Sequence, residues 1–127
     1  MEKQITPGLK YTFLVHAIMM TIFALTYLFI PVLWGDLTGC LSNQVPQVFR
    51  LFGIAILGYA ISSFFSYREN SWEKVKIVAQ MNSIITILFA IVLVLALTFW
   101  DLPSIGWMYF VVMSGLAIAF NYFYFSK

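Results

Sequence analysis

The side chains that could carry chemistry in this chain are a few polar groups placed inside long apolar segments. If those segments cross a membrane, each polar group is costly there and is therefore a candidate for function. The only histidine of the chain is among them, and the others are hydroxyls and amides. The candidate ligand-binding set is His16, Ser63, Gln80, Asn82 and Asn121.

These five residues are expected to lie at one depth. His16 follows Lys10 by six residues and Asn82 follows Lys76 by six, and the other three have similar spacings from a basic residue. At about 1.5 Å per residue, they lie roughly 6–10 Å inside the charged ends of their helices. We expect a polar layer in which these side chains hydrogen-bond one another and hold the helices together. The alternative is a site in the same layer that binds a lipid headgroup, a quinone or another amphiphile.

A second set of charges is expected at the opposite ends of the helices. Arg50 stands near the start of the second apolar segment, and Asp36 and Asp101 lie in connections on the same side. An arginine at the interface can pair with a carboxylate or extend its side chain to a lipid phosphate. We expect either a salt bridge between these loops or a headgroup contact.

The residue inventory argues against several kinds of site. The chain has one histidine and one cysteine, Cys40, and its apolar segments contain no Asp or Glu. A zinc site needs three or four ligands, and a disulfide needs two cysteines. The sequence also has no Gly-rich phosphate loop and no cluster of basic residues for nucleic acid. We expect no metal, no cofactor, no catalytic residue and no nucleic-acid partner, and an enzyme is the least favoured reading.

The elements that must position these residues are membrane-spanning helices. Hydrophobic residues make up 62% of the chain and charged residues only 9%, against about 45–50% and 25% in soluble domains. Four segments are long enough to cross a bilayer as helices, which needs about 20 apolar residues. We predict an all-α, up-down-up-down bundle that forms a single domain over residues 1–127. The predicted spans are 11–33, 48–67, 77–99 and 105–124.

The distribution of positive charge predicts the orientation of these spans. Six of the seven basic residues fall on the side that holds both termini and the middle loop, and only Arg50 falls on the other side. Loops rich in Lys and Arg stay in the cytoplasm. We therefore expect an integral membrane protein with both termini cytoplasmic. The prokaryotic plasma membrane is the leading expectation, and an organelle membrane is the alternative.

Local signals predict the connections and the packing. Pro31 is expected to bend the first helix near its end, and residues 68–76 are expected to form a polar hairpin. Small residues four apart allow helices to approach closely, either within the bundle or against a partner. Two such pairs are present, Gly58/Ser62 and Gly115/Ala119.

The second apolar segment also carries a motif-like run, Phe49-Arg50-Leu51-Phe52-Gly53, followed by Leu57-Gly58 and a closing Arg68. With the four-span layout, this run resembles the small DoxX-like and related four-helix membrane proteins. The resemblance implies a compact four-helix bundle and, as in some members, an accessory subunit of a membrane oxidoreductase. The chain lacks the paired cysteines of the thiol-redox relatives, so thiol chemistry is not expected here.

Two functions follow as hypotheses. The first is a non-catalytic accessory or scaffold subunit of a larger membrane complex, with membrane lipids and a membrane-protein partner or a second copy as its contacts. The alternative is a binder or carrier of an amphiphile at the polar layer in the cytoplasmic half of the bundle.

Overall fold

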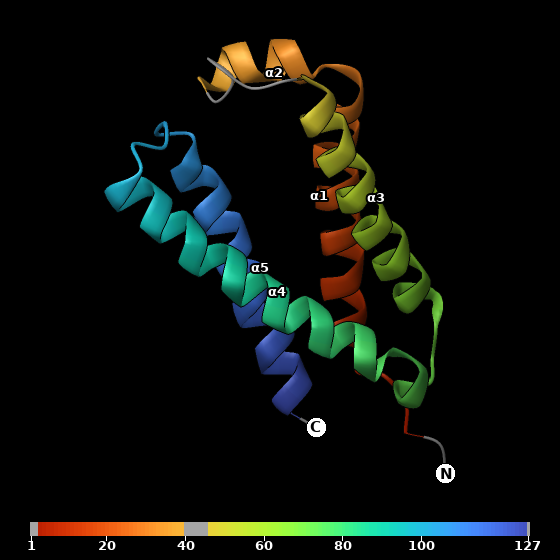
Figure 1. Cartoon of the computed structure of the whole chain (residues 1–127). Coiled ribbons are helices and arrows are strands. Elements are labelled where there is room, and N and C mark those ends of the chain that lie inside the picture. The colour runs from red at the N-terminus through yellow and green to blue at the C-terminus, as the bar shows by residue number, and fades with distance from the viewer. Residues whose placement is uncertain (1–2, 40–45, 127) are drawn as a thin grey trace.

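The computed structural model describes residues 3–39 and 46–126, a range that leaves out Cys40. Four helices in this range are long and apolar enough to cross a membrane, so the predicted all-α bundle with four spans is confirmed. A fifth, short helix follows the first one (Figure 1). The helices are α1 (Pro7–Phe29), α2 (Pro31–Thr38), α3 (Pro46–Arg68), α4 (Trp72–Phe99) and α5 (Gly106–Phe125).

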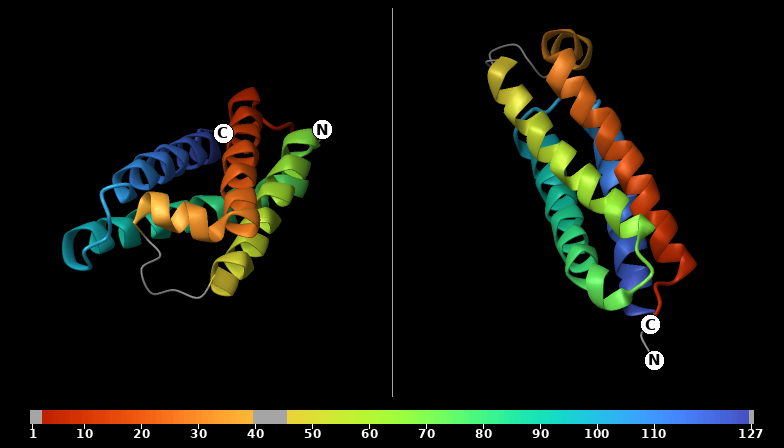
Figure 2. Two further views of the ribbon diagram at one scale, coloured as in Figure 1. Left: turned by 90° about the horizontal axis from the view of Figure 1, so that it is seen from above. Right: turned by 90° about the vertical axis from the view of Figure 1, so that its right-hand side faces the viewer.

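The four long helices form two antiparallel hairpins. α1 packs along α3, α4 packs along α5, and contacts between α1 and α5 join the two hairpins. Both termini lie at the end of the bundle that holds the turn between α3 and α4 (Figure 1), which we call the terminal end. α2 lies across the opposite, distal end, and the two hairpins diverge from each other toward that end (Figure 1). Figure 2 shows α1 beside α3 and α4 beside α5 from two further sides.

The first predicted span, 11–33, is wrong at its end because the chain breaks there. α1 ends at Phe29, Ile30 leaves the helical conformation with φ −128°, and α2 begins at Pro31. Proline has no N–H to continue a helix and disfavours helical dihedrals in the residue before it. The expected bend is therefore a complete break, and the short helix that follows ends at Gly39 with φ 72°.

The polar hairpin predicted over residues 68–76 is present but shorter, because α4 begins at Trp72, with Ser71 as its N-cap, and leaves only residues 69–71 between the helices. Glu73 and Lys76 belong to the first turns of α4 and form an ion pair on its surface. The 28 residues of α4 span about 42 Å, which exceeds the ~30 Å hydrocarbon core. α4 is therefore long enough to cross the hydrocarbon core with its charged first turns outside it.

The apolar core gathers side chains from all four long helices. Leu9, Phe13 and Phe120 are fully buried, and the two phenylalanine rings meet edge to face at 5.4 Å. Large apolar side chains are exposed on all four long helices, for example Ile77 on α4. Such a surface suits lipid tails, which are as apolar as these side chains.

α1 and α3 approach each other closely at Gly53. A Cβ there would lie 2.9 Å from Cγ of Leu28 and 3.1 Å from the backbone oxygen of Ala24. The predicted small-residue pairs do not serve this purpose within the bundle, because a Cβ at Gly58 or Gly115 meets nothing within 4 Å. The predicted close approach at these pairs is therefore wrong for internal packing, and their use against a partner stays a prediction.

Candidate functional site

Three of the predicted site residues meet inside the bundle. Nδ1 of His16 on α1 lies 2.8 Å from Oγ of Ser63 on α3. The Asn82 Nδ2 on α4 donates to the same hydroxyl oxygen at 3.0 Å. One serine therefore joins three of the four long helices.

The direction of the bond between His16 and Ser63 depends on the tautomer of the imidazole. The amide nitrogen of Asn82 can only donate, so the Ser63 oxygen accepts from it. In the tautomer of His16 that carries its proton on Nε2, Nδ1 accepts the serine proton. This arrangement satisfies the serine as both acceptor and donor.

A second bond brings in the remaining long helix. The Ser83 hydroxyl donates to Oδ1 of Asn121 on α5 at 2.9 Å, and the Asn121 amide donates to the carbonyl of Ala117 at 2.8 Å. Because Ser83 follows Asn82 on α4, the two bonds form one polar layer to which each long helix contributes. The imidazole of His16 also meets the Phe120 ring edge to face at 5.4 Å.

The centre of this layer is closed. His16 is 4% exposed, Ser63 is fully buried, and Asn82 is 1% exposed. The other amide atom of Asn82, Oδ1, has no hydrogen-bond partner among the described residues. An unpaired buried acceptor costs about 1–3 kcal/mol, so this oxygen is a weak point of the layer.

Gln80 does not join the layer, although the sequence places it at a similar depth. Its side chain is exposed on α4, while Ala79 and Asn82 of the same helix face inward. With about 3.6 residues per turn, neighbouring residues point in different directions, so Gln80 lies away from the face shared by Ala79 and Asn82. The depth of a residue along the helix does not show which way its side chain points.

In the described part of the chain, the distal charges form no ion pair with one another. Asp36, Arg50 and Asp101 are all exposed. The ion pairs found among the described residues join Lys74 to Glu69 and Lys76 to Glu73, and none joins Arg50 to either aspartate. The salt-bridge form of the prediction is therefore not seen here, and the headgroup contact of Arg50 stays a prediction.

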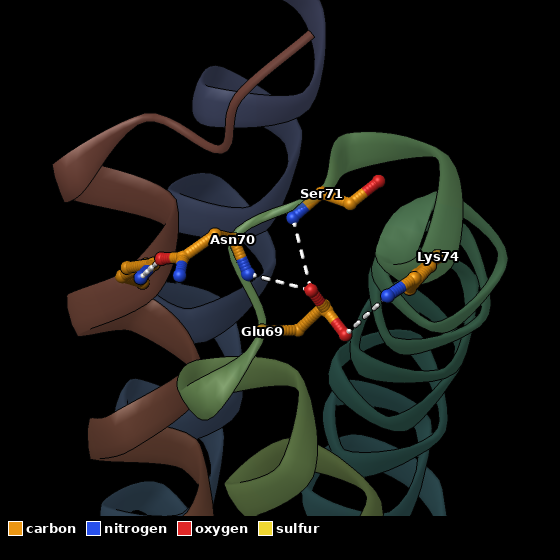
Figure 3. Close-up of polar contacts among 5 residues, drawn as sticks. Glu69, Asn70, Ser71 and Lys74 are labelled. Carbon is orange, nitrogen blue, oxygen red and sulfur yellow. Dashed lines mark hydrogen bonds and ion pairs between the residues drawn. The ribbon is translucent and has the colours of Figure 1, made fainter. Parts of the chain in front are cut away.

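The turn at the terminal end is organised by Glu69 (Figure 3). One carboxylate oxygen accepts the backbone N–H groups of Asn70 and Ser71 at 2.9 and 3.2 Å, and the other lies 3.3 Å from Nζ of Lys74. Hydrogen bonds to the ionised carboxylate hold the pKa of Glu69 below its ordinary value. The backbone N–H groups have the largest effect, and Lys74 adds to it. The carboxylate therefore remains ionised and bonded at neutral pH.

The N-terminal segment is tied to the same turn. The N–H of Ile5 donates to the carbonyl of Asn70 at 3.0 Å, and the N–H of Trp72 donates to the carbonyl of Lys3 at 2.9 Å. The ammonium group of Lys10 donates to Oδ1 of Asn70. The start of α1 and the end of α3 are thereby held together.

A pocket of about 460 Å³, which was not predicted from the sequence, lies at this place. Its cationic side chains are Lys10 from the first turn of α1 and Arg68 from the last turn of α3. From the sequence, these two residues contribute only to the predicted orientation of the spans in the membrane. The sequence positions of Lys10 and Arg68 could have indicated this pocket, because antiparallel packing brings the start of one helix beside the end of its neighbour.

Within the described residues, no three His, Cys, Asp or Glu side chains gather as metal ligands. Comparison of the chain with family models, with curated proteins and with solved structures gives no match.

Proposed function

We propose that this chain is a non-catalytic accessory or scaffold subunit of a larger membrane complex. The observation that supports this role is that the buried polar groups hydrogen-bond one another between helices. Ser63 binds both His16 and Asn82 across three helices, with the centre of the layer closed. Side chains whose hydrogen bonds are used between helices stabilise a bundle and leave few groups for chemistry on a substrate.

The resemblance to DoxX-like proteins favours the same role, because some members of that group serve as accessory subunits of membrane oxidoreductases. The exposed Gly58 on α3 and Gly115 on α5 are two positions at which a partner helix could approach the backbone closely. A membrane protein, including a second copy of this chain, is the partner that these positions suit.

The test is purification from the native membrane in a mild detergent, followed by mass spectrometry of the proteins and lipids that remain bound. We expect a membrane protein in fixed stoichiometry with the chain. A monomer that carries no protein partner under conditions that preserve other membrane complexes would contradict the proposal.

We also propose that both termini are cytoplasmic and that the membrane is a prokaryotic plasma membrane. The basic residues described at the terminal end outnumber the single Arg50 near the distal end, and such an excess is retained in the cytoplasm. They are Lys3, Lys10, Arg68, Lys74 and Lys76.

A reporter that is active only in the cytoplasm should be active when fused to either terminus. The same reporter inserted in the connection between α2 and α3 should be inactive, because that connection faces the other side. The opposite pattern would reverse the orientation, and activity at only one terminus would contradict an even number of spans.

A second candidate function is the binding of an amphiphile at the polar layer. Its support is the unpaired Oδ1 of Asn82, which could accept a bond from a hydroxyl or N–H group of a ligand. Replacing His16 and Asn82 by apolar residues separates the two candidates, because only a binder loses a ligand while its fold is preserved.

A further inference from the structure

The pocket at the terminal end has the composition of an anion site at a membrane surface. Lys10 and Arg68 provide two positive charges from facing helices, and Tyr11 and Tyr67 lie beside them. Tyrosine rings favour the headgroup level, where one edge meets water and the other meets lipid. The remaining lining residues are Gln4, Ile5, Pro7 and Asn70.

These two charges are not neutralised by acidic side chains in the described part of the chain. Lys10 donates to the neutral amide oxygen of Asn70, which leaves two of its three ammonium protons available. Arg68 forms no ion pair with a described residue, and its neighbour Glu69 is engaged by Lys74. The pocket is therefore a site of net positive charge.

An apolar groove of about 520 Å³ lies further along the same pair of helices. On α1, Lys10 and Tyr11 are followed at helical spacing by Leu14, Ile18 and Ile22. Residues three or four apart lie on one face of a helix, so the pocket and the groove follow a single stripe. The α3 side of the groove is formed by Ala60, Ile61, Phe64 and Phe65.

We propose that the α1–α3 hairpin binds one anionic glycerophospholipid, with its phosphate between Lys10 and Arg68 and an acyl chain in the apolar groove. The groove reaches Ile22, twelve residues past Lys10, which corresponds to about 18 Å along the helix. One leaflet of the hydrocarbon core is about 15 Å deep, so the groove accommodates an acyl chain over its full depth. This site is separate from the closed layer around Ser63 and does not depend on the proposed scaffold role.

The experiment compares lipids retained by the purified chain. The full-length protein is reconstituted in vesicles of four parts phosphatidylcholine to one part phosphatidylglycerol, extracted in mild detergent and analysed by native mass spectrometry. We expect the wild type to retain phosphatidylglycerol in excess over its share of the vesicle. The double variant Lys10→Gln/Arg68→Gln should lower this preference about fivefold for each charge removed.

The control is Lys76→Gln, which removes one positive charge at the same end of the bundle but outside the pocket and is compared with the single variant Lys10→Gln. Lys76→Gln should retain the wild-type preference. An equal loss in Lys76→Gln and in Lys10→Gln would indicate attraction by the overall charge and would overturn the site. Unchanged preference in the double variant would overturn it as well.

The apolar half of the site is tested by Ile61→Trp, which fills the groove from a position 48% exposed. The control Ile84→Trp places the same side chain on α4 at a position 50% exposed and outside the groove. Only Ile61→Trp should reduce the amount of phosphatidylglycerol retained. If glycerol phosphate in solution displaces the lipid from the wild type, the site binds a soluble anion and the proposal fails.

Discussion

Replacing Ser63 by alanine is expected to lower the free energy of unfolding by about 1–3 kcal/mol. The substitution removes one hydroxyl but leaves its two partners, Nδ1 of His16 and Nδ2 of Asn82, buried without the hydrogen bonds that they make to it. Buried polar groups that lose a partner cost more than the bond itself contributes. The measurement is reversible unfolding of the purified protein in mixed micelles, followed by circular dichroism.

The neighbouring serine offers a matched control. Ser62 is half-buried, and its hydroxyl donates to the carbonyl of Tyr59 on its own helix at 3.0 Å. Ser62→Ala leaves no side chain of another helix unpaired, so its effect should stay below ~0.5 kcal/mol. Equal stability of the Ser63→Ala and Ser62→Ala variants would show that the bonds across the helices contribute nothing measurable.

The second large effect is expected at Gly53, where α1 and α3 meet. The new Cβ of Gly53→Ala would lie 3.1 Å from the Ala24 carbonyl oxygen and 3.2 Å from the backbone nitrogen of Leu28. Backbone atoms cannot move aside as a flexible side chain can, so the helices must separate. We expect a loss of about 1–3 kcal/mol in the free energy of unfolding.

Gly58→Ala is the matched control, five residues further along the same helix. Its Cβ would meet nothing within 4 Å, and alanine favours the helix by up to ~1 kcal/mol over glycine. The two variants should therefore change stability in opposite directions, and denaturation of both in the same micelles measures the difference. Equal changes would contradict the close contact of α1 and α3 at Gly53.

Much of the architecture could be predicted because the membrane imposes it. A helix must be long and apolar to cross the bilayer. Because of this constraint, most of the predicted span ends lie within a few residues of the observed helix ends. The spacing of His16, Ser63 and Asn82 from the charged helix ends also predicts that they lie at one depth. Three of the five predicted ligand-site residues lie in the bonded centre of the layer, and Asn121 extends it through Ser83.

The remaining features depend on helix rotation and on contacts distant in sequence. Gln80 lies at a suitable depth but on the exposed face, and Gly53 rather than Gly58 meets the neighbouring helix. Neither difference is visible in a chain that is apolar on all sides, because hydrophobic periodicity then says little about which face is inward. α2 was missed because a short apolar helix after Pro31 looks like the end of a longer one.

The most direct test of the central claim is the double variant His16→Leu/Asn82→Leu. If the polar layer serves only to join the helices, replacing both partners by apolar groups is nearly neutral, since Ser63 can bond to the backbone of its own helix. We predict that this variant is purified folded, with the same protein partner and in the same stoichiometry as the wild type. A folded variant that loses its partner, or a small amphiphile that the wild type retains, would contradict the account and make the layer a binding site.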